Sequence, residues 1–358
     1  MGAYNQLIPV FVLTGFLGSG KTTLLNRMLR HPSLKNAAVL INEFGKIGLD
    51  HLLVERIDEN TVLLEGGCLC CTIRDDLKEA ILSLDDRRSR GEIPLYERMV
   101  IETTGLADPS PVLFTLMADQ TLRHHYRLGT VLTTVDAVNG WAHLERQEEA
   151  VKQATVADRI VLTKTDIAAP EDVAPLKRRL EELNPSAELL IGDHGEVDIA
   201  HLLHADLYDP ATKGEEVLRW VEAEAAKEAG RDGHEHGHDL NRHDTHIHSF
   251  CLRYDEPIDW TAFGIWLTML LHTHGENVLR VKGMLNVKGV ETPVVINGVQ
   301  HVVHPPMHLD AWPDDDRRSR IVFIVRDIAR QRIEESLEIF NSIGGGIGGA
   351  QPRGSEAA

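Results

Sequence analysis

Three of the four cysteines of this chain lie within four positions, in the stretch EGGCLCCT from Glu65 to Thr72. Thiolates of Cys68, Cys70 and Cys71 can occupy three corners of a tetrahedron around Zn²⁺ or another soft ion, and the two preceding glycines let the backbone wrap around it. The fourth ligand must come from elsewhere, because the paired C-x-x-C clusters of a closed zinc site are absent. A redox pair and a set of buried apolar thiols are the alternatives. We expect a metal site with an open position, which suits a site that releases its metal.

A second motif, GFLGSGKTT, follows the first apolar run of the chain and precedes a helical pattern. It matches the G-x-x-x-x-G-K-[ST] loop, in which backbone N–H groups surround the β-phosphate of a nucleotide. Lys21 is expected to reach the β- and γ-phosphate oxygens, and the hydroxyl of Thr22 to bind Mg²⁺. The N-terminus of the following helix adds its dipole to the same anion site. The predicted nucleotide-binding residues of this loop are Gly15, Gly18, Ser19, Gly20, Lys21, Thr22 and Thr23.

The sequence TKTD at residues 163–166 ends a late apolar run and indicates which base is bound. The carboxylate of Asp166 is expected to accept hydrogen bonds from the N1–H and 2-amino groups of guanine, whereas adenine would leave that carboxylate unpaired. The stem of Lys164 is expected to lie over the base. Thr163 stands where asparagine is commoner, and a plain strand end with a turn is the alternative. We therefore expect GTP rather than ATP.

The stretch IETTGLADP, residues 101–109, places Glu102 at the carboxyl end of another apolar run. This is the edge at which parallel α/β sheets bind ligands. Glu102 is therefore expected to hold the Mg²⁺ shell or to orient the attacking water, and the backbone N–H of Gly105 to meet the γ-phosphate. The alternative is that these residues only begin a helix.

Hydrophobic patterning predicts two domains. Seven β-branched runs alternate with amphipathic stretches between residues 8 and 195, which predicts an α/β fold with a doubly wound, mainly parallel sheet. From about residue 246, shorter strand patterns surround one aromatic helix and predict a smaller α+β domain. It carries no catalytic constellation, so we expect it to dock a partner protein or to dimerise. The predicted parts are a nucleotide-binding domain with the cysteine cluster (1–214), a helix and linker (215–245), the C-terminal domain (246–342) and a disordered tail (343–358).

The linker is rich in histidine. Its imidazoles can bind transition metals weakly, or the linker can be a solvated tether in which the histidines have no specific role.

Composition argues against a nucleic-acid-binding, a membrane-spanning or a secreted protein. A formal net charge of −18 argues against a nucleic-acid partner. The N-terminal apolar run is interrupted by glycines and lacks a preceding charged region, so we expect neither a membrane span nor a secretory signal. Clustered thiols without a disulfide framework indicate a reducing, cytoplasmic location.

Taken together, GFLGSGKTTLLN, INEFGKIGLD, EGGCLCCTIRDDL, IETTGLADP and LTKTD resemble the CobW-type (CobW/HypB/UreG-like) metallochaperone GTPases, from Pro9 to about residue 340. The resemblance implies slow GTP hydrolysis coupled to delivery of a transition metal, zinc first and cobalt next, to a client metalloprotein. It places the family's switch segment on residues 42–50, with Glu43 as a further metal ligand and Asp50 near Mg²⁺ or the attacking water. Lys46 stands where members usually carry an acid.

Both the switch segment and the cysteine cluster follow predicted strands on the nucleotide side of the sheet. Mg·GTP is therefore expected to bring Glu43 and the three thiolates into one coordination sphere, and hydrolysis to loosen it. The main alternative is a metal-buffering or sensing protein, in which GTP only sets the metal affinity and no dedicated client exists.

Overall fold

The computed structural model describes residues 7–41, 62–65, 73–192, 197–203, 217 and 247–347. The chain divides into two compact units, Met1–Thr245 and His246–Ala358. Among the helices of the described residues, none combines the length and the hydropathy needed to cross a membrane.

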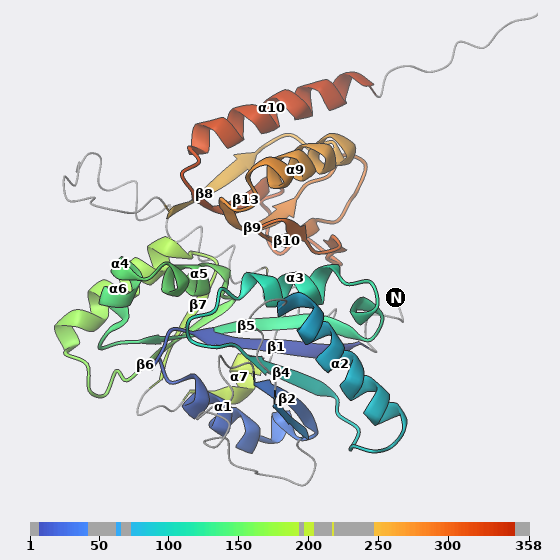
Figure 1. Cartoon of the computed structure of the whole chain (residues 1–358). Helices are drawn as coiled ribbons and strands as arrows, with labels where there is room; N and C mark the ends of the chain where they lie inside the picture. Colours follow the sequence, from blue (N-terminus) through green and yellow to red (C-terminus); the bar gives the residue numbers. More distant parts are fainter. Residues whose placement is uncertain are drawn as a thin grey trace, which may run out of the picture. The chain divides into compact units, whose positions relative to one another are not determined.

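The first unit is built around a sheet of seven parallel strands (Figure 1). Their order across the sheet is β3-β2-β4-β1-β5-β6-β7. This arrangement confirms the predicted doubly wound sheet. The chain passes from β1 to β2 on one side of β1, whereas the connection from β4 leads to β5 on the other side. The loop after β1 therefore lies at the switch point where such sheets bind ligands. The strands are β1 (Ile8–Gly15), β2 (Ala37–Ile41), β3 (Val62–Glu65), β4 (Arg98–Glu102), β5 (Tyr126–Asp136), β6 (Arg159–Thr163) and β7 (Glu188–Ile191).

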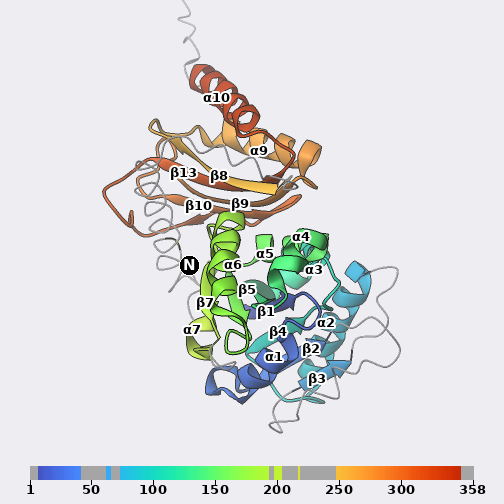
Figure 2. The same cartoon turned by 90° about the vertical axis from the view of Figure 1, so that its left-hand side faces the viewer.

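Helices cover both faces of this sheet (Figures 1 and 2). One face packs against α1 and α7, where Phe11 and Leu13 of β1 join Leu25 and Met28 of α1 in a buried apolar cluster. The opposite face packs against α2, α3 and α5. The helices are α1 (Lys21–Arg30), α2 (Ile73–Ser89), α3 (Ser110–Ala118), α4 (Gly140–Arg146), α5 (Glu148–Val156), α6 (Pro170–Leu183) and α7 (Ile199–Leu203), with short 3₁₀ turns η2 (Pro32–Leu34) and η3 (Leu122–His124).

The second unit is an antiparallel sheet with two helices on one face (Figure 1). The strand order is β11-β10-β9-β13-β8, and β12 pairs with β10. Phe263 and Trp266 of α9 and Leu337 of α10 pack onto Phe323 of the sheet, as expected for a small α+β domain. Its elements are β8 (Ile247–Tyr254), α9 (Trp260–His274), β9 (Val278–Leu285), β10 (Val294–Val299), β11 (Val302–Val303), β12 (Met307–His308), β13 (Ser319–Arg326) and α10 (Arg330–Ile347).

The C-terminal tail and the linker are the two parts for which the sequence predicts little regular structure. Helix α10 continues to Ile347, past residue 343, where the sequence predicts the start of a disordered tail. Glycine lowers helix propensity, but each residue added to an existing helix also adds a hydrogen bond. The predicted linker helix and the histidine-rich stretch lie outside the described residues, apart from Val217.

Candidate nucleotide-binding site

The loop between β1 and α1 has the backbone that its glycines predict. Gly20 adopts a left-handed conformation, with a φ of 90°, at the N-cap of α1. Gly15 lies so close to β5 that a Cβ atom there would stand 2.5 Å from the carbonyl oxygen of Thr134 and 2.8 Å from Ser19 Oγ. A side chain at either position would therefore disturb the loop.

Lys21 is held against this loop although it is a charged residue with only 7% of its surface exposed. Its Nζ donates hydrogen bonds to the carbonyl oxygens of Gly15 at 2.9 Å and Phe16 at 3.2 Å. The ammonium is thus fixed beside the backbone that would surround a phosphate. That position agrees with the predicted role of Lys21, and the role itself stays a prediction.

Thr22 and Glu102 come together from α1 and the end of β4. Thr22 Oγ1 donates a hydrogen bond to Glu102 Oε1 at 3.1 Å, and Glu102 is only 2% exposed. Strand pairing explains the contact, because Leu13 of β1 lies opposite Glu102 in the register, shortly before the loop begins. A hydroxyl and a buried carboxylate are hard oxygen donors of the kind that Mg²⁺ prefers, so these two residues fit a magnesium ion.

Thr163, at the end of β6, contacts the phosphate loop directly. Its Oγ1 donates to the carbonyl oxygen of Ser19 at 2.8 Å, while Ser19 Oγ shares a hydrogen bond of 2.7 Å with Thr134 Oγ1. Threonines at the ends of β5 and β6 therefore tether the loop from two sides. This contact gives the threonine a physical role at the position where the sequence motif more often has asparagine.

Lys164 follows Thr163 in a left-handed conformation, with a φ of 58°, and its Nζ donates to Asp136 Oδ2 at 2.8 Å. Asp136 ends β5 and also accepts hydrogen bonds from the backbone N–H of Val138 and the side chain of Asn139. Burial alone would raise the pKa of Asp136, but the hydrogen bonds from Lys164, Asn139 and Val138 outweigh it and hold that pKa below its ordinary value. Asp166, the predicted reader of guanine, is exposed on the same loop.

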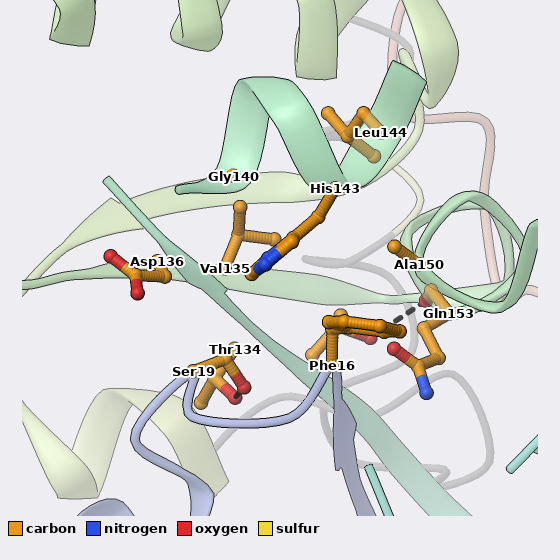
Figure 3. Close-up of a pocket in the computed structure, with 11 residues that line it drawn as sticks. Phe16, Ser19, Thr134, Val135, Asp136, Gly140, His143, Leu144, Ala150 and Gln153 are labelled. Atoms are coloured by element: carbon orange, nitrogen blue, oxygen red, sulfur yellow. Dashed lines mark hydrogen bonds between the residues drawn. The ribbon is translucent and has the colours of Figure 1, made fainter. Parts of the chain in front are cut away.

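A small hollow lies beside the phosphate loop, between β5, α4 and α5 (Figure 3). Phe16 packs against the ring of His143 there, with ring centroids 4.6 Å apart at an interplanar angle of 48°. The lining residues are Phe16, Ser19, Thr133, Thr134, Val135, Asp136, Gly140, His143, Leu144, Ala150 and Gln153.

Gln153 of α5 holds the loop that carries Gly105. The Gln153 side chain is 1% exposed, and its Nε2 donates to the carbonyl oxygens of Gly105 at 3.3 Å and Ala107 at 3.0 Å. On the other side, a Cβ at Gly105 would stand 2.7 Å from the backbone nitrogen of Leu17. Gly105 is therefore packed against the phosphate loop, where a γ-phosphate contact is feasible.

Asp136, Gln153 and Thr134 belong to this site but are not among the residues predicted from the sequence. An aspartate directly after a buried strand, in the stretch TTVDA, is the same signal that singled out Glu102 and could have revealed Asp136. No comparable sequence signal marks Gln153, which lies within a helix.

The predicted metal ligands Glu43, Cys68, Cys70 and Cys71 and the predicted catalytic Asp50 lie outside the described residues. Within the described ranges, no group of three or more His, Cys, Asp or Glu side chains could hold a metal ion. The strands that lead to these residues do end together, because Ile41 of β2 lies opposite both Glu65 of β3 and Glu102 of β4. The chain therefore leaves β2 and β3 at the edge where Thr22 and Glu102 meet.

Comparison with protein families gives two matches. Residues 9–191 match the CobW/HypB/UreG nucleotide-binding domain, and residues 247–340 match the C-terminal domain of the cobalamin synthesis protein CobW. The chain belongs to the CobW/HypB/UreG family. The resemblance expected from the sequence is confirmed.

Relatives within the CobW/HypB/UreG family align over nearly the whole chain. The zinc chaperone YjiA of Escherichia coli strain K12 is 31% identical over 330 residues, which cover 92% of this chain and 98% of YjiA. The zinc-regulated GTPase metalloprotein activator 1 of Schizosaccharomyces pombe is 28% identical over 359 residues, covering 90% of this chain and 83% of the relative. The crystal structure of Zn(II)-bound YjiA GTPase superposes with a TM-score of 0.68 at 27% identity, covering 93% of this chain and 99% of YjiA.

Proposed function

We propose that this chain binds and hydrolyses GTP with Mg²⁺ and uses that cycle to bind a transition metal and deliver it to a client metalloprotein. Zinc is the first candidate cargo and cobalt the second. One observation carries this proposal: the phosphate loop, the Thr22–Glu102 pair and the Thr163–Lys164 strand end meet at one sheet edge in a member of the CobW/HypB/UreG family. The names of the relatives, a zinc chaperone and a zinc-regulated GTPase activator, support the same assignment.

The described residues divide the work of nucleotide binding. Lys21 neutralises charge on the β- and γ-phosphates, and the backbone N–H of Gly105 contacts the γ-phosphate. Thr22 and Glu102 would hold Mg²⁺, which when bound offsets the negative charge of the phosphate oxygens. Asp166 selects guanine. Asp50 orients the attacking water.

The transferred metal is held by the thiolates of Cys68, Cys70 and Cys71, with Glu43 as a further ligand. Because β2 and β3 end level with Glu102, the segments that carry these ligands begin beside the nucleotide. GTP binding draws the ligands together, and hydrolysis releases them. Free thiolates require a reducing compartment, so the proposal places the protein in the cytoplasm.

The second unit is the part that docks the client or forms a dimer. Its helix α9 exposes large apolar side chains, with Trp260 40%, Ile265 52% and Met269 54% exposed. Exposed aromatic and methionine side chains are enriched in protein interfaces. Residues 1–214, 215–245 and 246–342 would then be the GTPase domain, the tether and the docking domain.

Phosphate release by the full-length protein tests the enzymatic half of this proposal. With Mg²⁺ present we expect slow hydrolysis of GTP and none of ATP, and a Lys21→Ala variant should lose the activity. Equal turnover of ATP, or turnover that survives Lys21→Ala, would contradict the assignment.

A capture experiment with zinc-loaded protein tests the delivery half. Protein bound to a non-hydrolysable GTP analogue should retain a metalloprotein partner from the source organism that the GDP-bound protein does not retain. Metal binding without any nucleotide-dependent partner would favour the buffering alternative.

A further inference from the structure

The proposed function assigns no role to Asp136, although this residue lies beside the phosphate loop. Its side chain is only 2% exposed, at the point where β5 ends beside the phosphate loop. It accepts hydrogen bonds from the backbone N–H of Val138 at 2.8 Å, from Asn139 Nδ2 at 3.0 Å and from Lys164 Nζ at 2.8 Å. A buried carboxylate with this many donors fixes the groups that it touches.

Lys164 is the group whose position this carboxylate determines. The lysine is in the left-handed region, which a residue with a Cβ rarely adopts, so its backbone is set by the surrounding loop. Its carbonyl oxygen accepts hydrogen bonds from the backbone N–H groups of Ile167 and Ala168. Its side chain is 36% exposed, and only the ammonium end is bound to Asp136. The carbon stem is therefore held in one direction and remains partly open to solvent.

We propose that Asp136 is a positioning residue for the guanine base, because its carboxylate anchors the ammonium of Lys164 and so presents the lysine stem as a preformed surface for the purine ring. This inference rests on the proposed GTP binding. A lysine without the anchor has several free rotors that must be ordered when the base binds. Ordering such a side chain costs a factor of roughly three to ten in affinity.

The chain offers a closely matched control in Asp119. Asp119 Oδ1 accepts hydrogen bonds from the backbone N–H of Thr121 at 2.9 Å and Leu122 at 3.0 Å, and its Oδ2 lies 2.7 Å from Lys78 Nζ. Lys78 is also 36% exposed. This carboxylate therefore has a lysine partner and backbone N–H donors as Asp136 does, although its side chain is more exposed, 19% against 2%. It follows α3, and its partners Lys78, Thr121 and Leu122 are not residues predicted to bind the nucleotide.

The test compares two ligands on the full-length protein. GDP uses the base surface and the phosphate loop, whereas inorganic tripolyphosphate uses only the phosphate loop. Asp136→Asn should weaken GDP binding roughly threefold to tenfold and leave the tripolyphosphate affinity within about twofold. Asp119→Asn should leave both affinities unchanged. A variant in which both ligands weaken equally, or in which GDP binding is unchanged, would overturn the inference.

A double-mutant cycle with Lys164→Met separates positioning from a loss of stability. If Asp136 acts through the lysine, Lys164→Met should weaken GDP by a similar factor, and adding Asp136→Asn should cost little more. Additive losses would contradict a shared mechanism. If Asp136→Asn does not fold, Lys164→Met decides. Replacing a lysine that is anchored to support the base must weaken GDP binding and leave the tripolyphosphate affinity unchanged, and unchanged GDP binding would overturn the inference. Wild-type protein that shows no preference for GDP over ADP would instead refute the proposed function.

Discussion

Replacing Thr163 by valine removes one hydroxyl group and nearly preserves the side-chain volume. That hydroxyl donates to the carbonyl oxygen of Ser19 at 2.8 Å and also lies 3.2 Å from the carbonyl oxygen of Val135. Thr163 is 9% exposed and Ser19 1% exposed, so water has little access to the carbonyl oxygen that would lose its donor. The substitution therefore isolates one hydrogen bond between β6 and the phosphate loop.

The expected cost follows from leaving a buried acceptor unsatisfied, which is about 1–3 kcal/mol. For a unit of about 200 residues, 1 kcal/mol corresponds to a decrease of about 2–4 °C in Tm. We therefore expect Thr163→Val to lower the Tm of the nucleotide-binding unit by roughly 2–12 °C. If the loop relaxes to avoid part of that cost, its phosphate-binding N–H groups shift, and GDP affinity falls by up to about tenfold.

The assay is thermal unfolding with and without GDP, together with a direct titration of GDP. Thr165→Val is the control, because the Thr165 hydroxyl donates to the carbonyl oxygen of Gly192 at 2.9 Å and not to the phosphate loop. The control should change Tm less and keep the GDP affinity. A Thr163→Val protein with wild-type Tm and wild-type GDP affinity would show that this hydroxyl does not hold the loop.

Three further substitutions probe other parts of the molecule. Glu102→Gln should weaken Mg²⁺ binding about tenfold to a hundredfold, seen as a higher Mg²⁺ requirement for GTP hydrolysis, because it removes the charge beside Thr22. Gly105→Ala should lower GTP affinity more than GDP affinity. The new methyl group would stand 2.7 Å from the backbone nitrogen of Leu17 and displace the N–H that is proposed to contact the γ-phosphate, which GDP lacks. Equal losses for both nucleotides would argue against that contact. Hydrogen bonds from a neighbouring arginine lower the pKa of Asp316 to about 2. The stability that this carboxylate contributes is complete above about pH 4 and lost as the pH falls toward 2. Asp316→Asn should therefore destabilise the second unit by about 1 kcal/mol at neutral pH, after allowance for solvent screening, and by nearly nothing at pH 2, as measured by amide exchange in β13.

The sheet of the first unit could be predicted because its strands are buried on both faces and appear as continuous apolar runs, such as VFVL and IVLT. The phosphate loop was predictable for a related reason. Gly15 and Gly20 occupy backbone positions that a Cβ would disturb, so their spacing is visible in the sequence.

The contacts that complete the site were less predictable because they join residues far apart in the chain. Asp136 meets Lys164 only because β5 and β6 pair in parallel, with Asp136 opposite Thr163. Gln153 reaches Gly105 from a helix whose sequence marks it as amphipathic and nothing more. The TKTD motif predicts that the lysine stem lies over the base, but nothing in the motif identifies the carboxylate of Asp136, which fixes the direction of the stem.

Coupling between nucleotide and metal is the central claim, and one measurement tests it most directly. Zinc affinity should be determined by competition with a chromophoric chelator, once with GDP and once with a non-hydrolysable GTP analogue bound. We expect the analogue to tighten zinc binding by about 5- to 150-fold, which corresponds to about 1–3 kcal/mol of coupling, and zinc to tighten the analogue by the same factor. Equal zinc affinities in the two nucleotide states would contradict the claim that GTP controls metal binding and release.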